Sequence, residues 1–210
     1  MVLDRMRESS ERIVDPIARR MAKINPNTVS WIAFVLAAFA AVLLAGSSIA
    51  TRDLLIGAFA FILVSGTFDA LDGAVARVSG KSSQKGDFLD HVLDRYADIA
   101  LILGFTFSFY SAGLALGMFA LIGVFMTSYL GTQAQAVGLK RNYGGILGRA
   151  DRLVYMLVAV AVEYLYGTTH YGPHGATFLF LTPFEWLLLF FGIAGNLTAV
   201  WRAVASWREI

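Results

Sequence analysis

Residues 68–98 read FDALDGAVARVSGKSSQKGDFLDHVLDRYAD, and this stretch decides how the rest of the chain is interpreted. It directly follows an apolar run, LLIGAFAFILVSG at residues 54–66, and leads into a second apolar segment. An aspartate at the centre of a membrane helix costs roughly 2.5–3.5 kcal/mol, so four of them facing lipid would cost about 10–14 kcal/mol. The acids are therefore expected to face a cavity inside the protein, where they are neutralised.

Four of these acids fall into two pairs at helical spacing. Asp69 and Asp72 are three residues apart, Asp90 and Asp94 are four apart, and each pair shares one face of a helix. Clustered carboxylates repel one another unless a cation lies among them, and oxygen ligands suit Mg²⁺, Mn²⁺ or Ca²⁺ better than zinc. The spacing therefore predicts that the two pairs converge on a divalent-cation site.

The residues between and around the two pairs fit a phosphate site. Gly73 allows close backbone approach beside the first pair, Arg77 can donate two hydrogen bonds to phosphate oxygens, and Gly86 lies in a flexible connection. A cation together with an arginine and small residues suggests a bound pyrophosphate. For Asp87 and Asp98, solvated acids with ordinary salt bridges remain an equal alternative.

Taken together, eight residues at fixed spacing resemble the signature of the CDP-alcohol phosphotransferases: Asp69-x2-Asp72-Gly73-x2-Ala76-Arg77-x8-Gly86-x3-Asp90-x3-Asp94. The resemblance implies an integral-membrane enzyme of phospholipid biosynthesis. Such an enzyme transfers a phosphatidyl-type group from a CDP-linked lipid to a polar alcohol and releases CMP.

The resemblance also implies a role for each residue of the signature. Two divalent cations, Mg²⁺ or Mn²⁺, would be bound by Asp69, Asp72, Asp90 and Asp94, and Asp94 would also act as the base that deprotonates the acceptor hydroxyl. The CDP group would be bound by Asp69, Asp72, Gly73, Ala76, Arg77 and Gly86. The family further implies a homodimer.

Composition independently indicates a membrane protein. The chain has 210 residues, of which 57% are hydrophobic and 15% charged, and its mean hydropathy is +0.64. This is too apolar for an ordinary soluble domain of that size. A net charge of +2 is too small to indicate nucleic-acid binding, and the absence of cysteine excludes disulfides and thiolate chemistry. No cleavable signal peptide is expected, because the first residues are charged.

The pattern of apolar runs predicts an all-α integral membrane protein with two parts. Residues 1–25 are expected to form an amphipathic helix in the headgroup plane, a soluble packing helix being the alternative, and residues 26–210 a domain of six transmembrane helices. The six spans are expected at Val29–Ala50, from Leu54 into the acidic motif, and at Phe88–Phe109, Leu114–Val137, Arg152–Tyr166 and Pro183–Trp207.

The distribution of basic residues predicts the orientation. Six spans place both termini on one side, and of the seventeen Lys and Arg residues only Arg52 falls on the other side. By the positive-inside rule, the termini and the acidic site of this multi-pass protein face the cytoplasm, in the cell membrane. Residues 167–182 are interpreted as an external loop, whose His170 and His174 are not expected to bind metal.

A second group of candidate residues is basic. Arg149 and Arg152 lie three residues apart at the start of a predicted helix, and Arg202 lies at the inner end of the last span. Such arginines can clamp a phosphate dianion, and anchoring to anionic lipid headgroups is the simpler alternative. The run GRADRL at residues 148–153 resembles the branch of the family that uses inositol phosphate as acceptor, the phosphatidylinositol or archaetidylinositol phosphate synthases.

The chain departs from that branch at the end of the fourth predicted span. The branch often carries a basic stretch there, whereas residues 128–133 read SYLGTQ and lack its two cations. Glycerol phosphate, serine or another alcohol therefore remains open as the acceptor.

A divalent-cation channel or transporter is the alternative of another class. Intramembrane acids often line ion paths, so it explains the carboxylates. It does not explain why Gly73, Ala76, Arg77 and Gly86 fall in the phosphotransferase spacing.

Overall fold

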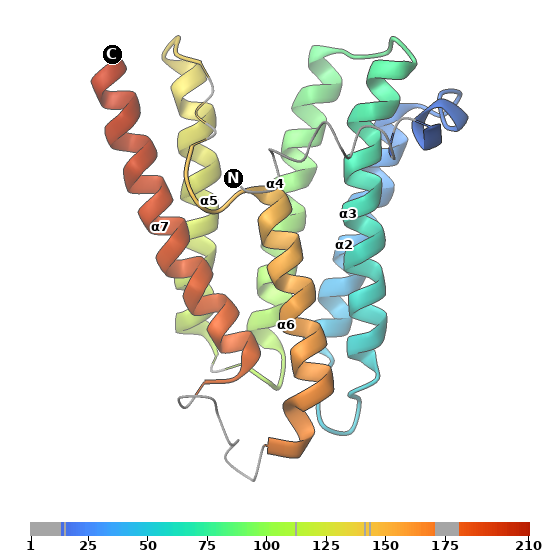
Figure 1. Ribbon diagram of the computed structural model, residues 1–210, viewed down its shortest axis with the longest axis vertical. Coiled ribbons are helices and arrows are strands. Elements are labelled where there is room, and N and C mark those ends of the chain that lie inside the picture. The colour runs from blue at the N-terminus through green and yellow to red at the C-terminus, as the bar shows by residue number, and fades with distance from the viewer. Residues whose placement is uncertain (1–13, 15, 112, 141, 143, 171–180) are drawn as a thin grey trace.

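The computed structural model describes residues 14, 16–111, 113–140, 142, 144–170 and 181–210, and for residues 168–170 only the backbone. The described residues form a bundle of long helices (Figure 1). In chain order these are α2 (Pro26–Ala45), α3 (Leu54–Val78), α4 (Gln84–Phe107), α5 (Leu114–Ala136), α6 (Arg149–His170) and α7 (Pro183–Glu209). The all-helical prediction is confirmed.

Four of the helices, α2, α3, α5 and α7, are long and apolar enough to cross a membrane. The shortest, α2, has 20 residues, which at a rise of about 1.5 Å per residue is about 30 Å, the thickness of a bilayer core. These helices fit a multi-pass membrane protein. Residues 16–20, ahead of α2, are also helical, but most of the segment predicted to form an interfacial helix lies outside the described residues.

Side chains cap the helices that begin near the acidic motif. The Asn25 side chain accepts a hydrogen bond from the backbone N–H of Asn27 at 3.0 Å, at the start of α2. The Ser83 hydroxyl accepts one from the N–H of Gly86 at 3.1 Å, at the start of α4. Each cap satisfies an N–H that has no partner within its helix, so the ends are fixed where the sequence places a polar residue.

Several helix boundaries differ from the prediction, among them the start of α4, which begins at Gln84 and not at Phe88. The first span, expected to continue to Ala50, ends at Ala45, where Gly46 caps it. The fifth, expected at Arg152–Tyr166, runs from Arg149 to His170. Its earlier start is stabilised by the side chain of Asp151, which accepts a hydrogen bond from the N–H of Gly148 at 3.2 Å. The predicted external loop therefore begins after His170, and His174 lies outside the described residues.

Helix packing divides the bundle into two groups that α4 and α6 join. Helix α2 packs against α3 and α4, and α5 packs against α7 (Figure 1). Between the groups, α4 contacts α5 and α7, and α6 contacts both α3 and α7. The α2–α4 approach requires a glycine, because a Cβ added at Gly104 would lie 2.7 Å from the carbonyl oxygen of Ala41. Gly195 and Gly123 meet in the same way between α7 and α5.

Helix α6 begins part-way down the bundle, below the level of the α3–α4 connection (Figure 1). The segment before it is held on α7: Arg202 Nε donates a hydrogen bond to the carbonyl of Gly144 at 2.8 Å, and Leu147 is fully buried. Gly145 has a φ of +116°, and a Cβ there would lie 2.2 Å from Thr198, so the segment can follow this path only with glycine. The first turn of α6 therefore lies at the depth of the acidic motif.

Candidate active site

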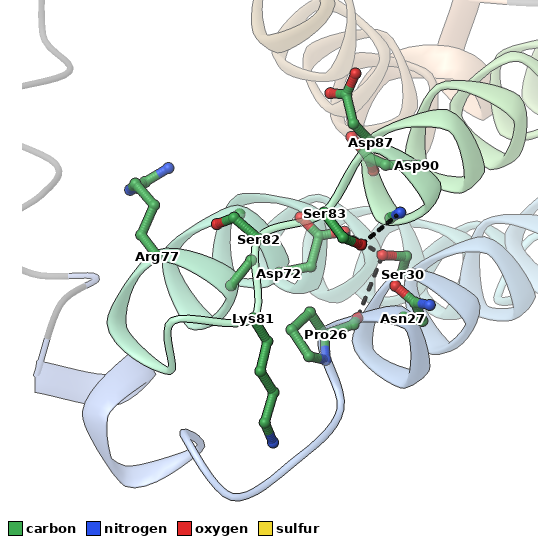
Figure 2. A pocket seen from close by; sticks show the side chains of 13 residues that line it. Pro26, Asn27, Ser30, Asp72, Arg77, Lys81, Ser82, Ser83, Asp87 and Asp90 are labelled. Carbon is green, nitrogen blue, oxygen red and sulfur yellow. Dashed lines mark hydrogen bonds between the residues drawn. The ribbon is translucent and has the colours of Figure 1, made fainter.

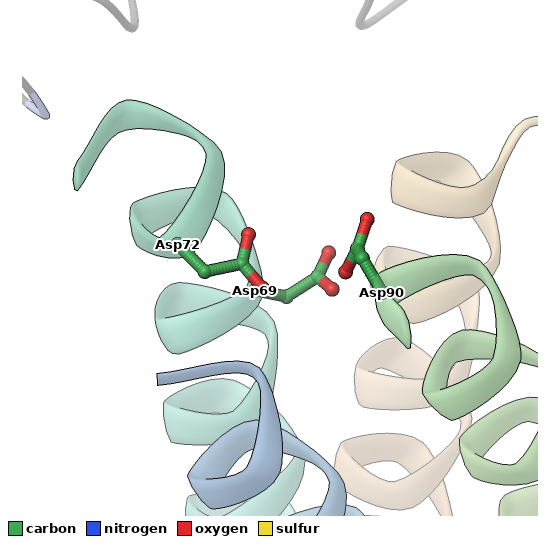
Figure 3. A group of neighbouring side chains, drawn as sticks. All are labelled: Asp69, Asp72 and Asp90. Atoms are coloured by element: carbon green, nitrogen blue, oxygen red, sulfur yellow. The ribbon is translucent and has the colours of Figure 1, made fainter. Parts of the chain in front are cut away.

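Three of the four predicted carboxylates meet between α3 and α4. Asp69 and Asp72 project from the last turns of α3, and Asp90 projects from the second turn of α4 (Figure 3). One carboxylate oxygen from each lies within 4.8 Å of the other two. Opposite ligands of an octahedral Mg²⁺ ion lie about 4 Å apart, so this spacing fits one cation among three carboxylates. Asp72 is buried and the other two are half-buried, so their mutual repulsion is poorly screened and favours such a cation.

A serine from a third helix holds the buried acid. The Ser30 hydroxyl, on the first turns of α2, donates a hydrogen bond to Asp72 Oδ2 at 2.7 Å. This fixes the rotation of the carboxylate. The signature does not predict Ser30, because its spacing covers only residues 69–94.

A cavity of about 210 Å³ opens beside the three acids, between the start of α2, the end of α3 and the start of α4 (Figure 2). Among its lining residues are five of the six predicted CDP-binding residues: Asp72, Gly73, Ala76, Arg77 and Gly86. The sixth, Asp69, lies with the carboxylates rather than in the cavity wall.

The cavity also has polar lining residues that the motif did not predict. Asn27, Lys81 and Ser83 all line it (Figure 2). A Cβ at Gly86 would lie 3.2 Å from Ser83 Oγ and 3.3 Å from Asn27 Oδ1, so a larger residue there would press on both. Amide, ammonium and hydroxyl groups at one opening give the cavity the donors that a nucleotide or a phosphate requires.

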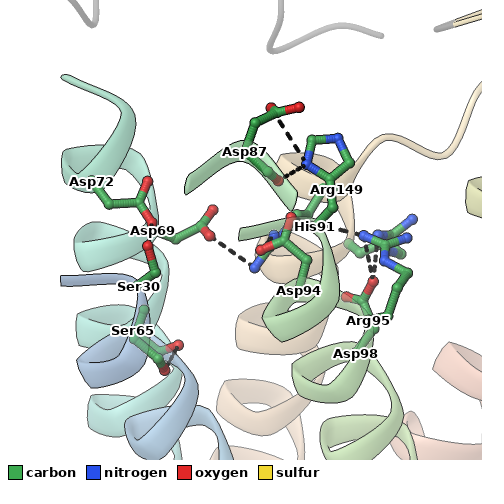
Figure 4. Close-up of polar contacts among 12 residues, drawn as sticks. Ser30, Ser65, Asp69, Asp72, Asp87, His91, Asp94, Arg95, Asp98 and Arg149 are labelled. Carbon is green, nitrogen blue, oxygen red and sulfur yellow. Dashed lines mark hydrogen bonds and ion pairs between the residues drawn. The ribbon is translucent and has the colours of Figure 1, made fainter. Parts of the chain in front are cut away.

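The fourth carboxylate, Asp94, lies one helical turn beyond Asp90 on α4 and forms an ion pair with Arg149 (Figure 4). Arg149 is the first residue of α6, and its Nη2 also lies 2.8 Å from Asp69 Oδ1. Among the described residues, Asp94 is thus connected to the group of three carboxylates through the guanidinium of Arg149 and not by direct contact. Arg149 neutralises one acid from each of the two helices.

The other two predicted acceptor arginines make different contacts. Arg152 is 2% exposed, and its Nη2 lies 2.7 Å from Asp98 Oδ2. Arg202, which is also buried, donates hydrogen bonds to the carbonyls of Gly144 and Thr127. Of the three, Arg149 is the one that contacts the acids of the signature.

The two acids left open by the sequence also differ from each other. Asp87 is exposed at the cavity rim and lies 3.6 Å from the His91 ring. Asp98 is buried and accepts from Arg152, while Arg95 approaches the same oxygen at 3.2 Å. The solvated interpretation therefore fits Asp87 and not Asp98.

Comparison with known proteins agrees with the signature. The family model described as CDP-alcohol phosphatidyltransferase matches residues 23–203. The chain belongs to this family. It is therefore a transferase, and the family accounts for the acids without a channel or transporter.

Two relatives cover most of the chain. The archaetidylinositol phosphate synthase of Methanothermobacter thermautotrophicus is 34% identical over 164 residues, covering 78% of this chain and 80% of the relative. The phosphatidylinositol phosphate synthase of Cutibacterium acnes is 32% identical over 214 residues, covering 99% of this chain and 98% of the relative.

Solved structures share the fold. The phosphatidylinositol phosphate synthase of Mycobacterium tuberculosis with CDP-DAG bound has a TM-score of 0.74 at 24% identity, covering 93% of this chain and 94% of that one. The same enzyme in complex with manganese and citrate has a TM-score of 0.73 at 23% identity, covering 92% of this chain and 88% of that one.

Proposed function

We propose that this protein transfers a phosphatidyl-type group from a CDP-linked lipid to inositol phosphate and releases CMP. The position of Arg149 is the observation that carries the choice of a phosphorylated acceptor. Its guanidinium lies on Asp69 and Asp94, beside the group of three carboxylates, where an acceptor phosphate can be held next to the reacting centre. The names of the two relatives point to the same acceptor.

The CDP group is proposed to occupy the cavity of Figure 2. Arg77 donates to its phosphates, and Gly73, Ala76 and Gly86 leave room for them. Asp69, Asp72 and Asp90 would hold divalent cations, Mg²⁺ or Mn²⁺, and Asp94 is connected to this group through Arg149. A bound cation supplies positive charge that neutralises the pyrophosphate and the departing CMP.

The chemical step is a displacement at the lipid-linked phosphorus. The acceptor hydroxyl oxygen forms a new bond to this phosphorus, the bond from phosphorus to the bridging oxygen breaks, and its electron pair leaves with CMP. Asp94 accepts the hydroxyl proton. The residues align the two reactants, so a slow bimolecular reaction proceeds within one complex.

Arg149 gives a reason why the acceptor carries a phosphate. A carboxylate held by a guanidinium is a weak base, because the pair stabilises its charged form. A phosphate dianion is a bidentate partner for arginine and competes for Arg149. Its arrival therefore frees Asp94 to take the proton, whereas serine brings no phosphate dianion to compete for Arg149.

The membrane arrangement is proposed from the apolar runs and from the distribution of Lys and Arg residues. Residues 1–25 lie in the headgroup plane, residues 26–210 span the bilayer six times, and the chain forms a homodimer, as the family resemblance implies. The C-terminus and the α3–α4 connection lie at one end of the bundle (Figure 1), the end that carries most of the Lys and Arg residues. This supports a cell-membrane location with the site facing the cytoplasm.

The test is CMP release from CDP-linked diacylglycerol by the purified full chain in detergent with Mg²⁺ or Mn²⁺. Inositol phosphate, glycerol phosphate, serine and unphosphorylated inositol are supplied one at a time. The highest kcat/KM is expected with inositol phosphate. A higher kcat/KM with glycerol phosphate or serine would refute the acceptor, and no CMP with any alcohol would refute the reaction.

A further inference from the structure

The buried ion pair between Arg152 and Asp98 has no role in the reaction described above. Asp98 follows Asp94 by one helical turn on α4, and Arg152 follows Arg149 by one turn on α6. Arg152 and Asp98 are 2% and 5% exposed, and their closest side-chain atoms are 2.7 Å apart. Two ion pairs therefore connect the same two helices, one at the candidate active site and one directly beneath it.

Helices α4 and α6 do not pack directly against each other. Across the described lengths of both helices, no two Cα atoms lie within 8 Å of each other. Helix α6 packs against α3 and α7 instead. The long side chain of Arg152 therefore spans a gap that the backbones leave open, and the length of this contact influences how far Arg149 stands from Asp94.

We propose that Arg152 and Asp98 are a positioning pair, which sets the distance between Arg149 on α6 and the base Asp94 on α4. The inference rests on the proposed function for the roles of Arg149 and Asp94. It assigns Arg152 to the support of the acceptor site and not to contact with the acceptor. Burial suits this role, because a pair removed from water holds a fixed geometry that an exposed pair does not.

Arg95 provides the matched control. It approaches the same Asp98 oxygen at 3.2 Å and lies 4.0 Å from Asp94, but its side chain is 25% exposed and it lies on the same helix as both acids. It therefore cannot set the separation of α4 from α6. Arg95→Gln removes one positive charge, as Arg152→Gln does, but leaves the ion pair between Arg152 on α6 and Asp98 on α4 in place.

The experiment measures kcat and KM for CMP release in Arg152→Gln, Asp98→Asn, the double variant and Arg95→Gln. A displacement of about 1 Å costs up to about a hundredfold in rate, so each bridge variant is expected to lose about ten- to a hundredfold in kcat. The KM for inositol phosphate should change less than about threefold, as should kcat in Arg95→Gln. The double variant is expected to be no slower than the slower single variant, because the two side chains act as a unit.

Thermal denaturation in detergent separates positioning from stability. Asp98→Asn leaves the buried charge of Arg152 without its partner, whereas the double variant removes both charges and should unfold near the wild-type temperature. A double variant that is stable and still slow supports the positioning role. A double variant that regains wild-type kcat would show that the pair only stabilises the fold.

A distance measurement tests the pair without turnover. The chain has no cysteine, so spin labels can be attached at Tyr96→Cys on α4 and Tyr155→Cys on α6, both exposed positions. The label separation is expected to shift or broaden in Arg152→Gln and to stay unchanged in Arg95→Gln. If wild-type protein releases no CMP, the proposed function fails and this distance alone decides the pair. An unchanged distance, or a KM for inositol phosphate raised as much as in Arg149→Gln, would overturn the proposal.

Discussion

The acidic region and the basic region of this site were predicted from the same kind of evidence, but the structure treats them differently. Asp69, Asp72 and Asp90 converge as their spacing indicated. The three arginines of α6 and α7 do not converge, because Arg149 reaches the acids while Arg152 and Arg202 bind elsewhere in the protein. Carboxylates at helical spacing on two neighbouring helices are positioned by local geometry, whereas the direction of a long arginine side chain depends on what lies around it.

The largest effect is expected at the acid that connects the two regions. Asp94→Asn keeps the shape of the side chain but cannot accept the hydroxyl proton, and general-base catalysis contributes about 10²–10⁴-fold. CMP release should fall by about that factor, while binding of CDP-linked lipid, measured by equilibrium binding to the purified variant, is retained. The control is Asp53→Asn, an exposed acid outside the site. Normal turnover by Asp94→Asn would show that Asp94 is not the base. The acidic site would then consist of the group of three carboxylates alone.

The acidic region should depend on a divalent cation in a way that the basic region does not. Chelation with EDTA is expected to abolish CMP release, and added Mn²⁺ should restore it in the wild type. Asp72→Asn removes one of three carboxylate ligands and should weaken Mn²⁺ binding by about tenfold or more, read by the electron paramagnetic resonance of free Mn²⁺. Arg149→Gln should not weaken Mn²⁺ binding, because its guanidinium competes for Asp69. Turnover that survives EDTA would contradict the assignment of the three acids.

Arg149 is expected to separate phosphorylated from unphosphorylated acceptors. A hydrogen-bonded charge pair contributes about 1.5–3 kcal/mol, so Arg149→Gln should raise the KM for inositol phosphate by about ten- to a hundredfold. The KM for CDP-linked lipid should stay within about twofold of the wild type. Arg208→Gln, an exposed arginine near the end of α7, is the matched control. An equal loss with unphosphorylated inositol would mean that Arg149 acts on the carboxylates and not on the acceptor.

The same contrast explains how far the sequence could predict the fold and the site. The helical class followed from long apolar runs, and the acidic site followed from fixed spacing on α3 and α4, two consecutive helices joined by a short connection. The partners of Arg152 and Arg202 could not be predicted, because Asp98 and the Thr127 carbonyl lie 54 and 75 residues away in the chain. Only the packing of α6 and α7 brings them together.

Boundaries and cavity walls show the same limit. The end of α2 at Ala45 depends on how Gly46 caps it, and the start of α6 at Arg149 depends on Asp151 and on a segment fastened to α7. The cavity gains Asn27 and Ser30 from α2, a helix more than forty residues before the second half of the motif. The signature spacing covers α3 and α4 only, so it carries no information about a third helix.

The smallest expected effect tests that third helix. Ser30→Ala removes the hydroxyl that fixes Asp72 but leaves every carboxylate in place. Loss of a group that orients a metal ligand costs about 10–100-fold in metal affinity, and because only one of three acids is affected, about tenfold weaker Mn²⁺ binding is expected. Ser65→Ala is a close control, since Ser65 is buried in the same α2–α3 interface and donates to the Ala33 carbonyl at 2.8 Å instead of to an acid (Figure 4). Equal Mn²⁺ affinity in the two variants would mean that α3 and α4 position the acidic site without α2. Local spacing alone would then position the acids, whereas the arginines depend on the surrounding helices.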